Sequence, residues 1–383
     1  MRRQSSIHAA QEDDTLRICY LHKRPGDCSS DGAGQQWKVI SAELRSRGHE
    51  ILEEELGATH TLRAWLAYLF GSVRWLFRYP RLRADVLIAE DIESAFVGAL
   101  ARHLFGGAMV LTFTRDYFSR ARGRGFRLRA ASVWLMERIV PLWADLVIAG
   151  DCQKRHFVQS VGVPANRITC ILPAVERSAS KPEGEIGRGT LLFVGDLESY
   201  NRVRILVRAL VLLKEKHGDL KLRLAGSGRA ERNLRRLVRN LQIEDRVTFG
   251  VRSERDISEL TRTAEIVLFT VADASNPRLH QALSSGKPVI ISNQSSAKTA
   301  LTDEEFPAEC VLKVEPTPEG FARGISLLRA GPMAAEFFGQ CGRQLVNKRS
   351  KPEKVAEDYE QVLLAAARGE SLEAEPSQIA AGL

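Results

Sequence analysis

The stretch Asp273–Ser292 reads Asp-Ala-Ser-Asn-Pro-Arg-Leu-His-Gln-Ala-Leu-Ser-Ser-Gly-Lys-Pro-Val-Ile-Ile-Ser, and the rest of the chain can be arranged around it. Its second half places apolar residues at helical spacing, then Gly286, which favours the end of a helix, then a buried parallel strand at 289–291. Its first half is a polar loop between a predicted strand at 266–269 and that helix. Doubly wound folds bind ligands beyond the carboxyl ends of their strands, and a helix N-terminus attracts phosphate. The stretch therefore predicts a nucleotide site.

Composition sets bounds on the class of protein. The chain has 383 residues, of which 44% are hydrophobic and 27% are charged, so it is long enough for two globular cores. Its six cysteines are scattered without a CxxC pair, which indicates neither a disulfide framework nor a zinc site. No apolar run approaches the roughly 18 residues that span a bilayer, and the N-terminus lacks a signal-peptide core. We expect a cytoplasmic protein that is neither secreted nor integral to a membrane.

Positive charge is concentrated in one quarter of the chain. Between residues 61 and 150 there are thirteen arginines and seven acidic residues, which account for +6 of the net charge of +8. A basic surface indicates a phosphate-rich partner, namely nucleic acid, anionic lipid or a sugar nucleotide.

Strand and helix patterns alternate along the whole chain, in two halves joined by a segment of Ser, Lys, Pro, Gly and Glu. This order predicts an α/β protein with two facing Rossmann-like domains and a ligand cleft between them. The expected parts are a disordered start at 1–14, a first domain at 15–175, a linker at 176–189, a second domain at 190–350, a last helix at 351–368 and a disordered tail at 369–383.

Several local boundaries are predicted as well. The pattern indicates a loop from Lys23 to Gly34, a helix from Trp37 to Arg47 and a strand at 50–52. Further along, it indicates a strand at 168–172 and a helix from Val203 to His217.

Two basic segments have two interpretations each. In 61–83, apolar residues follow helical spacing, arginines fall on another face and no acid intervenes. It is either a core helix with a solvated basic face or a helix that lies on anionic lipid with Trp at the interface. The segment 115–129 alternates arginines with Phe118 and Phe126. It is either a solvated loop or a contact for an acceptor or an anionic membrane.

A series of short motifs resembles one family. The motifs are Asp31-Gly32, Arg47–Glu50, Gly162–Pro164 followed by Ile171–Pro173, Leu192–Gly195, Leu222–Gly228, Asp245–Phe249 and Ala282–Val289. Together they resemble the retaining GT-B glycosyltransferases of the GT4-like family. The resemblance implies a C-terminal crossing helix and metal-independent transfer of a hexose from a nucleotide diphosphate sugar. The implied acceptor is lipid-linked or a polysaccharide.

The donor motifs of that family are altered in this chain. Its Glu-x7-Glu pair aligns with Asp273 and Gln281, of which the first still accepts hydrogen bonds and the second has lost its charge. The usual diphosphate-binding Arg and Lys align with Asp196 and Asn201, and an Asp beside a diphosphate is repulsive. Arg202 or Arg278 would have to replace those cations. The family's histidine after the fourth strand aligns near Thr114.

The resemblance thus assigns roles by position. The implied catalytic residues are Asp273, Gln281 and Asp116. The implied donor-binding residues are Gly195, Asp196, Asn201, Arg202, Gly226, Ser227, Ser275, Asn276 and Arg278. The implied acceptor residues are Gly32 and Arg115.

Four functional hypotheses follow. The first is an active transferase with a rewired phosphate site, and the second is a pseudoenzyme that acts as a partner in glycan assembly. A nucleotide-sugar epimerase is less favoured, because no acid/base pair is evident. Nucleic-acid binding has only charge in its favour, because no binding module accompanies the arginines.

Overall fold

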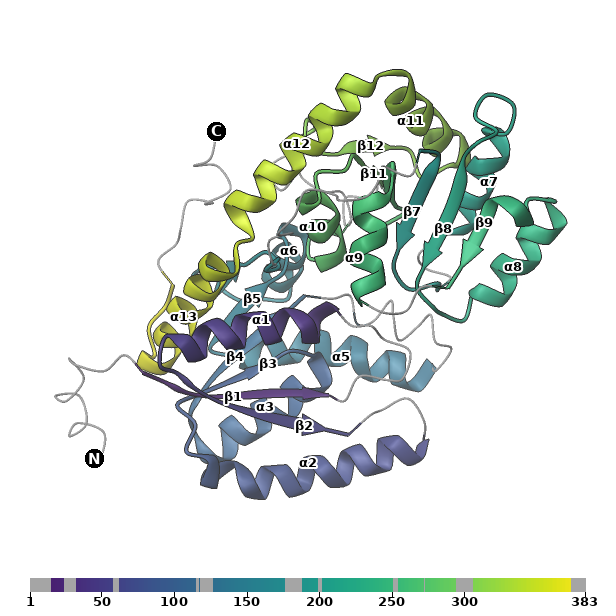
Figure 1. The fold of residues 1–383 in the computed structure, drawn as a ribbon. Coiled ribbons are helices and arrows are strands. Elements are labelled where there is room, and N and C mark those ends of the chain that lie inside the picture. Colours follow the sequence, from purple (N-terminus) through teal and green to yellow (C-terminus); the bar gives the residue numbers. More distant parts are fainter. Residues whose placement is uncertain are drawn as a thin grey trace, which may run out of the picture.

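The computed structural model contains two six-stranded parallel sheets, each with helices packed on it (Figure 1). The structure describes residues 15–23, 32–57, 62–114, 117, 127–175, 188–198, 202–250, 254–271, 273–293 and 306–372. The expected linker and both expected tails therefore lie largely outside the described residues.

The first domain follows the predicted alternation. Its elements are β1 (Arg17–Lys23), α1 (Gly32–Ser46), β2 (Glu50–Leu56), α2 (Leu62–Leu82), β3 (Val86–Ala89), α3 (Ile92–Phe105), β4 (Ala108–Phe113), α5 (Arg127–Trp143), β5 (Leu146–Ala149), α6 (Cys152–Ser160) and β6 (Ile168–Cys170). The strand order is β2-β1-β3-β4-β5-β6. Strands β3 and β5 are buried along their whole length, as expected of a sheet covered on both faces.

The second domain repeats the plan. Its elements are β7 (Thr190–Val194), α7 (Arg204–Leu212), β8 (Lys221–Ala225), α8 (Glu231–Asn240), β9 (Val247–Phe249), α9 (Glu254–Thr263), β10 (Ile266–Phe269), α10 (Pro277–Ser284), β11 (Val289–Ser292), β12 (Leu312–Val314), α11 (Pro318–Ala330), α12 (Pro332–Arg349) and α13 (Pro352–Arg368). The strand order is β12-β11-β10-β7-β8-β9. The predicted helix end is confirmed, because Gly286 follows α10 with φ of +75°.

The two strand orders locate a switch point in each sheet. In the first sheet the chain passes from β1 to β2 on one side and returns to β3 on the other. In the second sheet it passes from β7 to β8 and β9 and returns to β10. Ligands of doubly wound sheets bind at these points, outside the carboxyl ends of the strands. The switch points therefore direct attention to the loops after β1, β3, β7 and β10.

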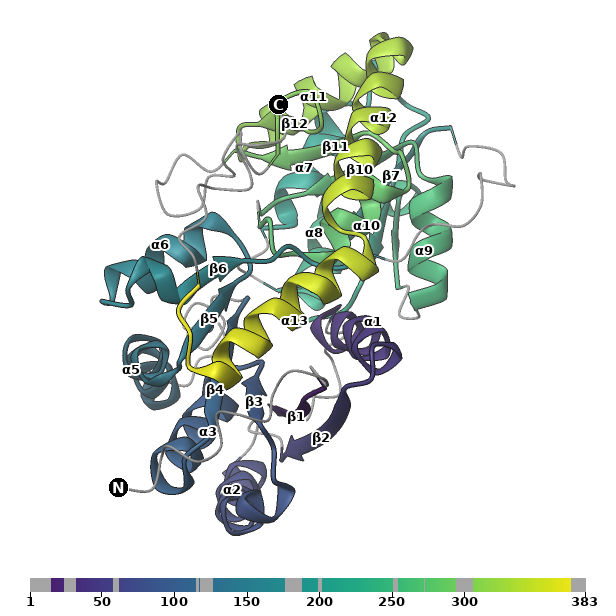
Figure 2. The same cartoon turned by 90° about the vertical axis from the view of Figure 1, so that its left-hand side faces the viewer.

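The last helix, α13, crosses back to the first domain and lies beside α1 (Figure 2). Its Tyr359 and Leu363 are buried in the same core cluster as Trp37 and Ile40 of α1. The predicted crossing helix is confirmed.

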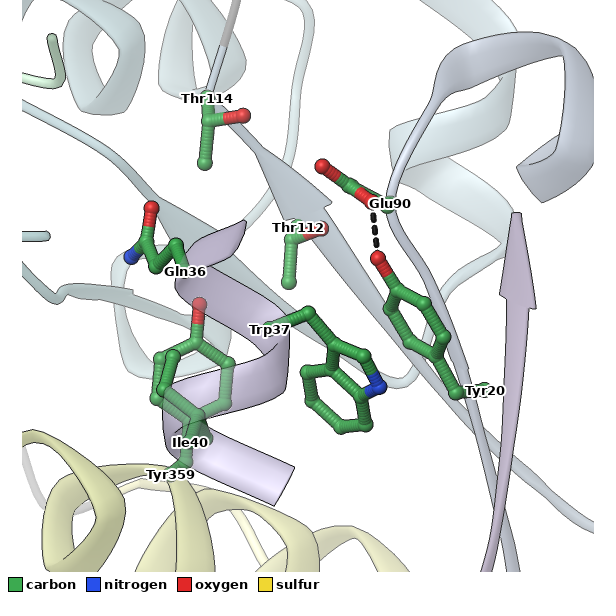
Figure 3. Close-up of a pocket in the computed structure, with 8 residues that line it drawn as sticks. All are labelled: Tyr20, Gln36, Trp37, Ile40, Glu90, Thr112, Thr114 and Tyr359. Carbon is green, nitrogen blue, oxygen red and sulfur yellow. Dashed lines mark hydrogen bonds between the residues drawn. The ribbon is translucent and has the colours of Figure 1, made fainter. Parts of the chain in front are cut away.

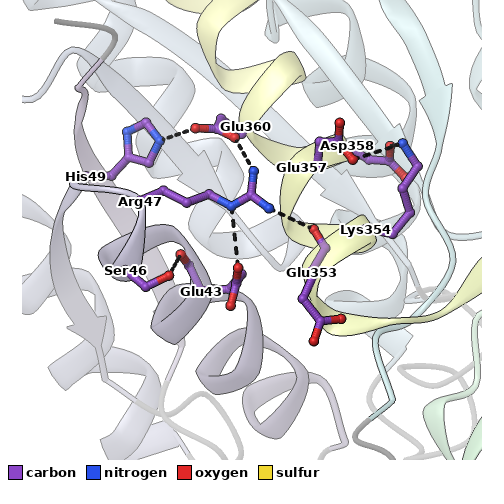
Figure 4. Close-up of polar contacts among 9 residues, drawn as sticks. All are labelled: Glu43, Ser46, Arg47, His49, Glu353, Lys354, Glu357, Asp358 and Glu360. Atoms are coloured by element: carbon purple, nitrogen blue, oxygen red, sulfur yellow. Dashed lines mark hydrogen bonds and ion pairs between the residues drawn. The ribbon is translucent and has the colours of Figure 1, made fainter.

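A polar cluster fixes this crossing helix at the end of α1 (Figure 4). Arg47 Nη1 lies 2.8 Å from a Glu360 carboxylate oxygen, and His49 Nε2 lies 2.9 Å from the other. His49 Nδ1 accepts from the backbone N–H of Leu16, so Nε2 carries the proton. Partial burial works to raise the pKa of Glu360, but the bonds from His49 and Arg47 lower it. Gly48, with φ of +98°, makes the turn between the two donors. The Arg-Gly-His motif thus has a structural role.

Several predicted boundaries were wrong. The loop predicted from Lys23 to Gly34 ends earlier, because α1 already begins at Gly32. Strand β2 extends to Leu56, since this edge strand pairs with β1 over seven residues while Glu53 and Glu55 face solvent. Strand β6 stops at Cys170, because β5 ends at Ala149 and offers no further partner. Helix α7 stops at Leu212, where tighter turns replace it.

Candidate functional site

The loops after β7 and β8 pack against each other at the second switch point. Gly195 and Gly226 have φ of +152° and +150°, and a Cβ on Gly226 would lie 2.0 Å from the Gly195 carbonyl oxygen. The Leu197 N–H donates to the Ser227 carbonyl over 2.8 Å. The structure therefore gives Gly195, Gly226 and Ser227 a role in loop packing, and their contact with a donor stays a prediction. Asp196 lies between these packed residues, at the end of β7.

The loop after β10 is ordered by its own side chains. Asp273 Oδ1 accepts from the Ser275 N–H over 3.1 Å, and Asn276 Oδ1 caps α10 by accepting from the Arg278 N–H over 3.0 Å. Pro277 occupies the first turn of α10, where its missing N–H costs nothing. The predicted polar loop at a helix N-terminus is confirmed. The site residues Asp273, Ser275, Asn276 and Arg278 are thus brought together.

This loop touches the first domain directly. The Ser275 hydroxyl lies 2.7 Å from the Thr114 carbonyl oxygen and 2.6 Å from Asp273 Oδ1, so its one proton serves either acceptor. Thr114 follows β4. At the end of β5, a Cβ on Gly150 would lie 2.6 Å from the Ser275 Cβ. The carboxyl edges of the two sheets therefore meet at Ser275.

Lys154 of α6 adds an ion pair across the same boundary. Its ammonium contacts Asp151, the N-cap of α6, and lies 3.1 Å from Asp273 Oδ1. Its side chain is only 12% exposed. Burial works to lower the pKa of Lys154, but Asp273 and Asp151 raise it, so the ammonium is charged at neutral pH. Burial raises the pKa of Asp151 to about 6, against the pull of Lys154.

Lys154 was not predicted from the sequence. The available signal was a cation three residues after Asp151, at the carboxyl edge of a strand. Its partner Asp273 is 119 residues away, so the pair itself is a product of the tertiary fold.

His280, in the middle of α10, was also missed. It is fully buried, its Nε2 lies 2.7 Å from the Ala274 carbonyl oxygen, and its Nδ1 lies 3.1 Å from the Ser350 hydroxyl. A carbonyl only accepts, so Nε2 carries the proton and Nδ1 accepts from Ser350. Burial lowers the pKa of His280 to about 4, which keeps it neutral. The Ser350 carbonyl in turn accepts from the Val175 N–H over 2.9 Å. His280 thus joins the Asp273 loop to the boundary between the domains.

Gln281 is held by protein groups. Its Oε1 lies 3.4 Å from Arg278 Nη1, and its Nε2 donates to the Ser258 hydroxyl over 2.8 Å. The Gln281 amide therefore lies next to Arg278, one of the two cations expected at the donor site.

A pocket lies at the switch point of the first sheet (Figure 3). Its cavity volume is only about 20 Å³, room for about one water molecule, and it is lined by Tyr20, Gln36, Trp37, Ile40, Glu90, Thr112, Thr114 and Tyr359. These side chains come from β1, α1, the end of β3, β4 and the crossing helix α13. Both the crossing helix and the sheet edge thus build the pocket.

The polar groups of this pocket are only partly satisfied. The Tyr20 hydroxyl donates to Glu90, and its ring stacks on Trp37 with centroids 4.0 Å apart. Burial raises the pKa of Tyr20, so the hydroxyl keeps its proton. The indole Nε1 of Trp37 and the hydroxyl of Thr114 are buried without a hydrogen-bond partner among the described residues. Such orphan groups need an explanation, and a polar ligand is one.

The remaining predicted site residues are placed as follows. Gly32 begins α1, whose next turns line the pocket, and Arg202 precedes α7 with φ of +48°. Arg115, Asp116 and Asn201 lie outside the described residues.

Within the described residues, no cluster of His, Cys, Asp or Glu is arranged to hold a metal ion, and no helix is long and apolar enough to cross a membrane.

Comparison with known proteins identifies the fold and the kind of domain. Residues 176–345 match the family model described as glycosyl transferases group 1. An uncharacterized glycosyltransferase of Haemophilus influenzae is 25% identical over 293 residues, which cover 74% of this chain and 77% of the relative.

Solved structures agree in fold. Sucrose-phosphate synthase from Thermosynechococcus elongatus superposes with a TM-score of 0.74 at 18% identity, covering 90% of this chain and 98% of that one. Anabaena HepE, solved in complex with UDP and glucose, gives 0.72 at 16% identity, covering 91% and 99%. The GT-B fold and the prediction of a glycosyltransferase are confirmed.

Proposed function

Because this chain is a glycosyltransferase of GT-B fold with a group 1 domain, we propose that it transfers a hexose from a nucleotide diphosphate sugar to a glycan or lipid-linked acceptor. The transfer retains the anomeric configuration, as in the GT4-like enzymes that the motifs resemble. The observation that carries this proposal is the position of Asp273. It lies at the switch point of the second sheet, beside a helix N-terminus, and touches the first domain through Lys154.

The donor lies, in this proposal, along the loop after β10. Asp273 accepts a hydrogen bond from a sugar hydroxyl, while the N-terminus of α10 and the Arg278 guanidinium face the diphosphate. Arg278 then supplies charge that the family places at the positions of Asp196 and Asn201, and Arg202 assists it. The nucleotide in the Anabaena HepE structure supports a donor of this class. Stabilisation by these groups makes the proposed reaction independent of a metal.

One hydroxyl group of the acceptor enters the pocket of the first domain, and the rest of the acceptor lies outside it. The Glu90 carboxylate accepts a hydrogen bond from this hydroxyl, and Thr114 lines the same pocket. The pocket and the donor loop adjoin, because the carbonyl of the same Thr114 contacts Ser275. Acceptor and sugar are thereby brought side by side.

Turnover tests the proposal. Full-length protein is incubated with a panel of UDP- and GDP-sugars, and release of nucleotide is measured together with binding by calorimetry. We expect turnover with at least one donor and a loss of about 100-fold or more in Asp273→Asn. The matched control is Asp245→Asn, an exposed residue beside β9, which should keep full activity. Binding without turnover would instead favour a catalytically impaired partner in glycan assembly. No binding of any donor would overturn both.

A further inference from the structure

Helices α2, α3 and α5 lie side by side on one face of the first sheet, and α1 and α13 cover the other (Figure 2). The outer side of these three helices is unusually apolar. Of the fifteen exposed large apolar side chains in the described part of the chain, eleven lie on α2, α3 and α5. Phe70 and Phe77 of α2 are each 73% exposed, and Trp134 and Trp143 of α5 are 41% and 45% exposed. Exposed apolar side chains gathered on three neighbouring helices indicate an interaction surface.

The same face carries positive charge with almost no exposed acid. Arg74 and Arg81 are exposed on α2, and the Arg138 guanidinium lies 3.9 Å over the Trp134 ring. The three helices contain only two acidic residues. Glu93 is paired with Lys23 and Glu137 is buried. The surface therefore combines aromatic and aliphatic groups with arginines, the composition of segments that lie in a lipid headgroup region.

We propose that this three-helix face, formed by α2, α3 and α5, docks on the surface of an anionic lipid bilayer. The exposed phenylalanines and tryptophans enter the boundary between headgroups and acyl chains. The arginines meet the acidic headgroups.

A second copy of the chain fits the face less well. A two-fold interface would bring the same patch of both subunits together and place arginine against arginine without acids to pair them. An anionic bilayer supplies the missing negative charge.

The two sides of α2 have different roles. Tyr68, Trp75 and Tyr79 are buried in the domain core, so the helix is a core helix on one side. The apolar stripe of segment 61–83 includes Trp65, whose side chain lies outside the described residues, so a tryptophan of α2 at a lipid interface stays a prediction. Among the described side chains, the exposed aromatic residues of α2 are Phe70 and Phe77, and the exposed tryptophans come from α5.

Docking would leave the proposed donor site uncovered. The exposed apolar residues lie in the middle and C-terminal parts of the three helices. Helices that connect parallel strands run antiparallel to them, so these parts lie toward the amino edge of the sheet. The interdomain contact at Thr114 and Gly150 lies at the opposite, carboxyl edge.

Vesicle sedimentation without nucleotide sugar tests this inference independently of catalysis. Full-length protein is mixed with vesicles of phosphatidylcholine alone or with phosphatidylglycerol added. We expect binding to the anionic vesicles only, weakened by salt. The double variant Phe70→Ser/Phe77→Ser should bind at least about tenfold more weakly. Arg74→Glu/Arg81→Glu should lose the preference for anionic lipid.

The matched control is Met333→Ser/Phe337→Ser on α12 of the second domain, whose side chains are also exposed, at 85% and 54%. It should bind like the wild type, and thermal unfolding should show that all variants fold. No sedimentation of the wild type, or equal loss in the control, would overturn the inference. A dimer in light scattering that Phe70→Ser/Phe77→Ser abolishes, without vesicle binding, would assign the face to self-association instead.

Discussion

The two sheets share one topology, but their carboxyl edges are built differently. The second edge is closed by backbone, because the loops after β7 and β8 pass so near each other that Gly226 has no room for a side chain. The first edge is open and built from side chains, with Tyr20, Trp37 and Glu90 around a pocket. A backbone-built edge offers fixed amides to a ligand, whereas a side-chain-built edge changes its shape with each substitution. This contrast fits a constant nucleotide partner on one side and a variable acceptor on the other.

One small cluster joins the two edges. Lys154 holds Asp273 from the first domain, and Ser275 contacts Thr114 from the second. The predictions that follow separate the two edges and this joint, beginning with the largest effect.

Replacing Lys154 by Met should destabilise the protein by about 3–5 kcal/mol, because two carboxylates would then lie together without a cation. Urea unfolding measures the loss. Lys216→Met, at an exposed position, is the matched control. Adding Asp151→Asn to Lys154→Met should recover part of the stability. Equal stabilities of Lys154→Met and the control would show that the joint is dispensable.

Substituting Gly226 by Ala should cost about 3 kcal/mol, since its Cβ would overlap the Gly195 carbonyl and its φ of +150° suits only glycine. Gly71→Ala, on α2 of the first domain, is the counterpart. Its Cβ meets nothing within 4 Å, so the better helix propensity of Ala should add about 1 kcal/mol. Thermal unfolding of the two variants compares them. A neutral Gly226→Ala would contradict the view that backbone closes the second edge.

Acid should weaken the second domain through His280. Its pKa is about 4 in the folded protein against an ordinary 6.5, so below pH 6.5 the unfolded chain takes up a proton that the folded chain resists. The stability that depends on a neutral His280 is fully present above pH 6.5. It is lost as the pH falls toward 4, by about 3 kcal/mol in all. Nearby Asp273 opposes this shift without cancelling it. Urea unfolding between pH 7.5 and 5 should show the decline in wild type and a shallower one in His280→Gln. Equally steep declines in the wild type and in His280→Gln would refute this role of His280.

Much of this architecture could be predicted from local patterns. The strands, the Asp151 cap, the Gly286 helix end and the polar loop at Asp273 all follow from residue types that act over a few positions. The joint could not be predicted in this way, because Lys154 and Asp273, like His280 and Ser350, meet only when distant segments fold together. Helices α11 and α12 were not assigned either.

The family model covers residues 176–345, the half whose loops need glycines at fixed places. The first domain carries less of this local signal, since its pocket depends on side chains from five elements and on the returning α13. The Arg-Gly-His motif was noticed there, but its partner Glu360 lies 313 residues from Arg47. The sequence therefore indicated the motif without its purpose.

The smallest predicted effects are kinetic, and they test whether the edges act separately. With a donor and acceptor found by the panel, Arg278→Ala should raise the donor KM about tenfold and leave the acceptor KM unchanged. Glu90→Gln, in the pocket, should raise the acceptor KM about tenfold and leave the donor KM unchanged. The double variant should show both increases at the size seen in the single variants, because the free-energy effects of sites without shared partners are additive. If either variant moves both constants together, the two edges form one binding surface, and the division of labour between the domains fails.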